Sequence, residues 1–91
     1  MNSEKFLASI ELNLTPIAPE FMPGIIKKQM ENLDISYKGM TPDNARLFIT
    51  NVADALSIFI GPERSNNARK FMMKKLRECC SENEMDLLTA Y

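Results

Sequence analysis

The side chains with the most distinctive chemistry in this sequence are two adjacent thiols, Cys79 and Cys80. A pair of thiolates could bind a soft metal ion or respond to an oxidant, and a symmetric dimer would supply four sulfur ligands. On a helix, however, adjacent side chains diverge by about 100°, and the spacing is not that of a Cys-x-x-Cys motif. Because buried cysteine also serves as a small apolar residue, a thiol-based sensor is the third of three hypotheses.

A basic run between residues 64 and 77 is the second group of side chains that could do chemistry. It holds six of the eleven Lys and Arg residues. Helical spacing places four of the six on one arc opposite the apolar stripe. These four are Arg69, Lys70, Lys74 and Arg77. The arc could follow nucleic-acid phosphates, with this helix as the reader of a helix-turn-helix. Since any soluble amphipathic helix has a charged face, nucleic-acid binding is the alternative interpretation.

A third group consists of apolar side chains that could bind a partner. The chain has seven methionines, and exposed methionine surfaces adapt to different partners, although most methionines fill cores. The segment 16–33 is apolar at helical spacing, but Pro19 and Pro23 make it hard to bury fully in a small bundle. We therefore predict a partner or dimer surface here, formed by Phe21, Met22, Ile25 and Met30.

Other kinds of site are not indicated by the sequence. There is no histidine, so the usual proton shuttle near neutral pH and the commonest metal ligand are both missing. The three glycines are isolated, which excludes a glycine-rich phosphate loop and a dinucleotide fingerprint. No two carboxylates stand out by their spacing as an acid and base pair. We expect no catalytic residues, no metal ligands and no cofactor, and so not an enzyme.

The length and the net charge of the chain further narrow the class of protein that it can be. Ninety-one residues make one domain, residues 1–91, whose single core leaves a thin margin of stability that a dimer interface would widen. The net charge of -1 gives no global attraction to nucleic acid or to an anionic membrane. The apolar runs are shorter than the ~20 residues that span a bilayer, and the first residues lack a secretory pattern. We expect a cytoplasmic protein with no membrane partner.

The residues that must position these groups read as helices. Leu, Met, Ala, Lys and Glu are plentiful, while glycines and β-branched runs are few, which predicts an all-α bundle of four to five helices. The clearest helix is 42–60, which we expect to be central and buried. Thr41 is a capping residue, Pro42 and Asp43 suit a first turn, and Gly61 suits a stop.

The remaining helices follow from the same signals. A first helix is expected at about 4–12 with Ser3 as its cap, and a second from Pro16 to 33 with a kink or break near Pro23. Residues 34–40 read as a connection, and a fourth helix runs from Pro62 to about Cys79. A short helix at 82–90 would close the chain. The expected core residues are Phe48, Val52, Leu56, Phe59, Phe71, Met72 and Leu76.

Together these observations favour a non-catalytic, helical interaction module. The partner is a protein or a second copy of the chain, and the class is a small regulatory or signalling protein that forms a homodimer.

Overall fold

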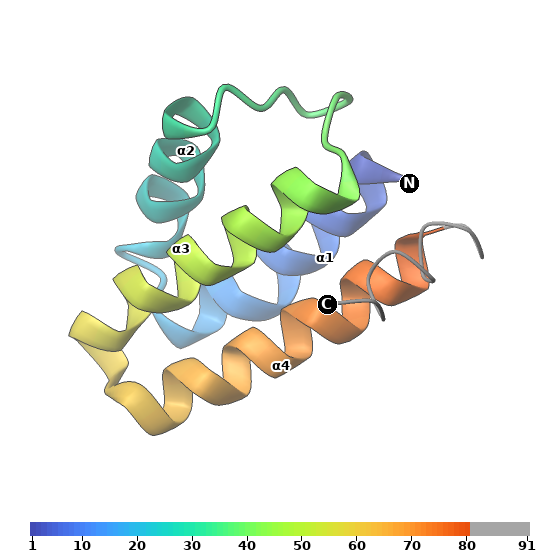
Figure 1. Ribbon diagram of the computed structural model, residues 1–91. Coiled ribbons are helices and arrows are strands. Elements are labelled where there is room, and N and C mark those ends of the chain that lie inside the picture. Colours follow the sequence, from blue (N-terminus) through green and yellow to red (C-terminus); the bar gives the residue numbers. More distant parts are fainter. Residues whose placement is uncertain (81–91) are drawn as a thin grey trace.

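The elements of the fold are all helical. The computed structural model describes residues 1–80. These contain α1 (Ser3–Leu14), a short 3-10 turn η1 (Thr15–Ile17), α2 (Met22–Asn32), α3 (Pro42–Ile60) and α4 (Pro62–Cys79) (Figure 1). No strand occurs in residues 1–80, so the all-α prediction is confirmed. The helix expected at 82–90 lies outside the described residues. None of the helices described is long and apolar enough to cross a membrane.

Helices α3 and α4 meet at a sharp corner at Gly61. The capping residues, prolines and glycine that the sequence indicated lie at the ends of these helices. Thr41 Oγ1 accepts a hydrogen bond from the Asn44 amide at 3.3 Å, and Pro42 opens α3. Gly61, at φ 85°, is the single residue between the last residue of α3 and the first of α4. Such a short link makes the two helices pack along each other. The buried Ser65 hydroxyl joins them by donating a hydrogen bond to the Ala53 carbonyl oxygen.

The core lies where the apolar faces of α1, α2, α3 and α4 meet. Its fully buried residues, which come from all four helices, are Phe6, Leu7, Ile10, Met22, Ala45, Phe48, Val52, Leu56, Met72 and Leu76. Phe6 and Phe48 join α1 to α3 edge to face, with ring centroids 6.4 Å apart. A domain of this size has a single core, so burial of these apolar side chains is the main contribution to the stability of the fold.

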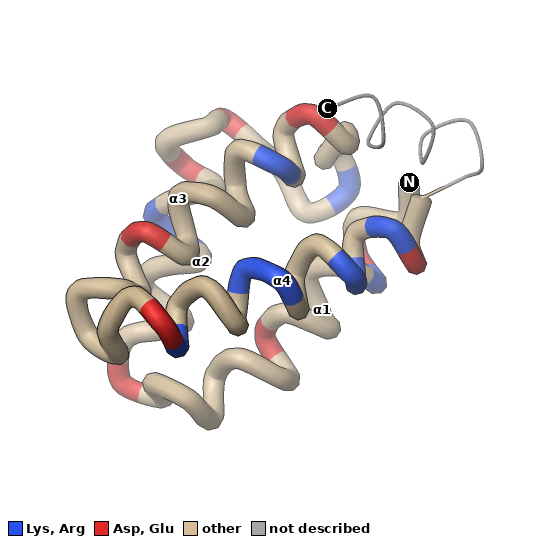
Figure 2. The backbone as a smooth tube through the Cα atoms, turned by 60° about the horizontal axis from the view of Figure 1, so that its bottom comes forward, with Lys and Arg blue, Asp and Glu red and all other residues tan. Residues whose placement is uncertain are grey.

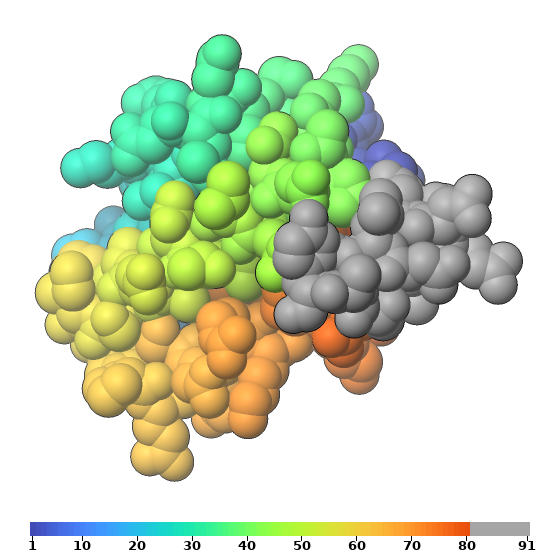
Figure 3. All heavy atoms as spheres, in the orientation of Figure 1, coloured from blue at the N-terminus to red at the C-terminus, as the bar shows by residue number. Residues whose placement is uncertain are grey.

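Two residues expected in this core are not fully buried. Phe59 is 48% exposed, whereas Phe71 is partly buried and packs against the core. The buried residues of α3 end at Leu56, and in its last turn Ile60 is partly buried against the core. Nor is α3 buried on all sides, because Leu47 and Ile58 are exposed on its outer face. Figure 3 shows this outer face between α2 and α4.

The second helix differs from the one expected. A kink or a break was expected near Pro23 in a helix from Pro16 to 33. The structure has an interruption and not a kink: the chain makes the 3-10 turn, then bends through residues 18–21 before α2 begins at Met22. Pro23 therefore lies in the first turn of α2. A proline is tolerated there because the first amides of a helix have no partner within the helix, whereas in the interior its ring would break the helix.

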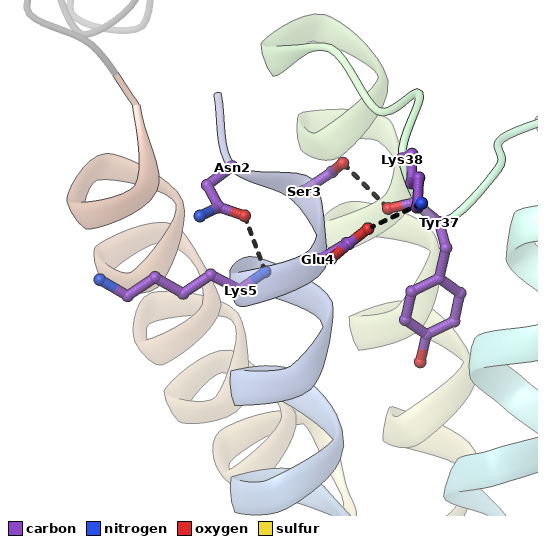
Figure 4. A network of polar contacts seen from close by, with 6 residues as sticks. All are labelled: Asn2, Ser3, Glu4, Lys5, Tyr37 and Lys38. Atoms are coloured by element: carbon purple, nitrogen blue, oxygen red, sulfur yellow. Dashed lines mark hydrogen bonds and ion pairs between the residues drawn. The ribbon is translucent and has the colours of Figure 1, made fainter.

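The start of α1 is tied to the loop that precedes α3. Asn2, not Ser3, caps the helix, since Asn2 Oδ1 accepts a hydrogen bond from the Lys5 amide at 3.1 Å. Ser3 instead lies inside α1, and its hydroxyl donates to the Tyr37 carbonyl oxygen at 2.9 Å (Figure 4). Figure 4 also shows the exposed ion pair of Glu4 with Lys38, 3.8 Å apart. These contacts hold the loop over α1.

Candidate functional site

Two aromatic side chains stack on each other at the end of α3, and each is about half exposed to solvent. Phe21, just before α2, and Phe59, in the last turn of α3, lie with ring centroids 4.1 Å apart and planes at 15°. Phe21 is 43% exposed and Phe59 48%. Stacking on each other removes part of each ring from water, yet a considerable apolar area stays uncovered. The pair is the largest exposed aromatic feature of the described residues.

A groove of about 350 Å³ lies between the end of α1, η1 and the two helices that meet at Gly61. Ile17 and Ile60, which are close in sequence to the two rings, line it together with Phe71 and Arg64. We call Ile17, Phe21, Phe59, Ile60 and Phe71 the aromatic face. It is formed by η1, the bend before α2 and the two helices that meet at Gly61, so the corner and the 3-10 turn position it.

The four residues expected to form a partner surface do not share one exposed surface. Met22 is fully buried, so that assignment is wrong for this residue, which faces the core from the first turn of α2. Ile25 packs partly against the core, and Met30 lines a different cavity. Of the four, only Phe21 belongs to the aromatic face. Its stacking partner Phe59 was assigned to the core, because helical spacing alone does not show where the core ends.

Another cavity, of about 580 Å³, lies between α1, α2 and the loop after α2. Ile26, Met30 and Ile35 form its apolar part, and Glu11, Glu31 and Asp34 its acidic part. Tyr37 reaches over it and its hydroxyl donates a hydrogen bond to Glu11 Oε1. Within residues 1–80, no group of three or more potential ligand side chains could hold a metal ion.

We expect the Tyr37 hydroxyl to keep its proton to unusually high pH. The hydrogen bond to Glu11, burial and the charge of that carboxylate raise the pKa of Tyr37 from 10.0 to about 12. Because the folded state holds this proton more tightly than the unfolded chain, the contribution to stability is complete below pH 10 and is lost as the pH rises toward about 12. Tyrosinate absorbance during a pH titration measures the shift.

Two variants test the origin of this shift. Glu11→Gln should lower the pKa of Tyr37 toward the ordinary tyrosine value, since the negative charge is removed. The sequence contains two tyrosines, so Tyr37→Phe identifies which transition belongs to Tyr37. An unchanged transition in Glu11→Gln would show that this carboxylate does not set the pKa.

A third hollow, about 330 Å³, lies between α3 and α4 and is basic. Three of the four predicted basic residues, Arg69, Lys70 and Arg77, line it, while Lys74 is exposed and lies outside its lining. Arg46 of α3 lines it as well, a residue that the sequence-based hypothesis missed. The signal was available, since Arg46 and Arg77 stand at nearly equal distances in sequence from the corner at Gly61.

The two thiols lie at the end of α4, and one of them is buried. Cys79 is buried at the end of α4, and this burial raises the pKa of its thiol; Glu78 acts in the same direction, against Lys5, Lys75 and the N-terminal amine. Cys80 is partly buried and follows the helix. A raised thiol pKa lowers the thiolate fraction, which is the reactive form.

No protein-family model, curated protein or solved structure shows significant similarity to this chain.

Proposed function

We propose that this protein is a non-catalytic interaction module that forms a homodimer through the aromatic face. The observation that supports this most directly is the stacked pair of Phe21 and Phe59, each close to half exposed. Aromatic side chains are enriched at the centre of protein interfaces, where they contribute much of the binding free energy.

A second copy of the chain is the partner that suits this surface. An aromatic side chain has roughly 150–250 Å² of surface, so the two rings together leave on the order of 150–200 Å² uncovered. With the groove included, a two-fold interface would cover each face with its own counterpart. The nearby charged residues carry both signs, since Glu20 precedes Phe21 and Arg64 lines the groove. A two-fold axis therefore need not oppose only like charges.

The dimer is proposed to act in the cytoplasm as a regulatory or signalling module. The buried Cys79 thiol suits a reducing compartment, where cysteines remain unoxidised. In this proposal no cofactor takes part, and the partner beyond the second copy is a protein.

The proposal is tested by measuring the dimer dissociation constant by sedimentation equilibrium. Phe59→Ser should raise this constant at least ~10-fold, because it removes a half-exposed ring from the centre of the interface. Leu47→Ser is the matched control, since Leu47 lies on the same helix and is 54% exposed but does not belong to the aromatic face. This control should change the constant by less than ~2-fold. Circular dichroism checks that both variants keep their helix content.

Two results would contradict this function. One is a wild-type protein that stays monomeric throughout the concentration range. The other is an equal effect of Phe59→Ser and Leu47→Ser, which would place the interface on the outer face of α3 as a whole. Phe21→Ser provides a second variant, and it should behave like Phe59→Ser because the two rings form one stacked unit.

A further inference from the structure

The basic groove lies between the first half of α3 and the middle and end of α4. Within residues 1–80, seven residues line it, of which four are cationic and none is acidic: Arg46, Ile49, Thr50, Arg69, Lys70, Met73 and Arg77. Three of the four cations are arginines, whose planar fork of N–H donors matches the oxygens of a phosphate. We infer that this basic groove binds the phosphate backbone of a nucleic acid.

The corner at Gly61 builds the groove from two helices. Arg46 comes from α3, while Arg69, Lys70 and Arg77 come from α4, so cationic side chains line the hollow from both helices. Figure 2 shows the Lys and Arg positions along α4. A site shared in this way differs from a helix-turn-helix, in which one helix alone enters the major groove and reads base edges. It is suited to contacts with phosphates, which position a nucleic acid without reading its sequence.

A neighbouring side chain orients one of the cations in the groove. Arg69 donates from Nη2 and Nε to Asn66 Oδ1, at 2.8 and 3.3 Å, which orients the guanidinium group and uses two of its five N–H donors. Thr50 adds a hydroxyl donor to the lining. The nearest acidic side chain in sequence on α3 is Asp43, which lines an adjoining hollow together with Leu47 and two residues of the groove, Arg46 and Thr50.

The spacing of the cations favours a polymer over a small anion. Lys70, Lys74 and Arg77 follow one another along α4 at about 6 and 4.5 Å, given the rise of 1.5 Å per residue. Lys74 is outside the groove lining, so the positive path extends beyond the hollow. A nucleic-acid strand presents one phosphate per nucleotide and could meet all of these cations, whereas a single anion would meet only those in the hollow. Lys75 is not part of this path, because it pairs with Glu78 at 3.2 Å.

The net charge of the protein makes the inference testable. With a formal charge of -1, the chain has no overall attraction to nucleic acid, so binding must depend on the groove. The test is fluorescence anisotropy of a labelled single-stranded DNA, titrated at low salt and again near ~150 mM. The double variant Arg46→Gln with Lys70→Gln removes one charge from each helix. We expect at least a ~10-fold weaker affinity and a salt dependence reduced by about two charges.

The matched control is the double variant Lys27→Gln with Lys28→Gln, which removes the same net charge from exposed positions of α2. It should weaken binding by less than ~3-fold. Arg46→Lys provides a second variant that keeps the charge but loses the fork; an affinity between those of wild type and the double variant supports phosphate recognition. Circular dichroism confirms that each variant is folded.

Several outcomes would overturn the inference. These are the absence of DNA binding by the wild-type protein at low salt, or equal losses in the groove and control variants. Competition by pyrophosphate as strong as that by unlabelled DNA would make the groove a site for small anions. Competition by polyglutamate of equal charge, with the same sensitivity to the groove variants, would make it a site for acidic peptides. Binding of duplex DNA in place of single strands would support it.

Discussion

Replacing Phe48 by Ala is expected to lower the free energy of unfolding by about 3–5 kcal/mol. Phe48 is fully buried at the meeting of α1 and α3, where its ring contacts Phe6 edge to face. The substitution removes the transfer free energy of the ring, leaves a cavity that neighbours fill only partly, and loses the aromatic contact. For a chain of 91 residues, with a total stability of roughly 5–14 kcal/mol, this is a large part of the whole.

The measurement is urea denaturation followed by circular dichroism, compared with Leu47→Ala. Leu47 is the sequence neighbour of Phe48 and lies on the same helix, but is 54% exposed. We expect that control to stay within about 0.5 kcal/mol of wild type. If both substitutions had the same effect, the assignment of Phe48 to the core and Leu47 to the surface would be wrong. A Phe48→Ala variant that is unfolded without denaturant agrees with the prediction.

The ends of α3 and α4 could be predicted from the sequence because local chemistry determines them. Thr41 satisfies a first-turn amide, Pro42 and Pro62 lack only a donor that would have no partner, and Gly61 allows a positive φ. Each of these effects acts within a few residues. The apolar spacing was equally informative where a helix lies over the core, as the burial of Phe48, Val52 and Leu56 shows.

The segment from Thr15 to Asn32 was harder because two structures satisfy its prolines. Pro23 could have kinked a long helix or stood in the first turn of a new one, and the apolar spacing is the same in both cases. In the structure Pro23 lies in the first turn of a new helix, and Met22 is buried at the start of that helix, α2. Tertiary packing, which sequence spacing does not contain, made that choice.

Both candidate surfaces depend on contacts between distant residues, and sequence reasoning recovered only parts of them. Phe21 was named without Phe59, and the basic residues of α4 without Arg46. In each case the missing residue lies on α3, brought into place by packing rather than by neighbourhood in sequence. Because the link between α3 and α4 is short, residues at similar distances in sequence before and after Gly61 are nonetheless expected to face each other.

The second large prediction concerns Gly61, the residue between α3 and α4. Gly61→Ala is expected to destabilise the fold by about 1–3 kcal/mol. Gly61 has φ 85° and ψ 162°, a region that is open essentially to glycine alone. A methyl group at this position would meet no atom within 4 Å, so the cost is backbone strain and not a steric clash. Any relief of the strain would have to change the angle between α3 and α4, and with it the aromatic face and the basic groove.

Thermal unfolding of Gly61→Ala against Gly24→Ala separates this strain from the general effect of replacing glycine. Gly24 lies in the first turn of α2, is exposed and has open space around it, so alanine there should stabilise the protein by about 0.5–1 kcal/mol. The two variants make the same chemical change, yet the melting temperature should fall for Gly61→Ala, by roughly 5–15 °C, and rise for Gly24→Ala. Changes of the same sign would mean that the corner does not require a positive φ.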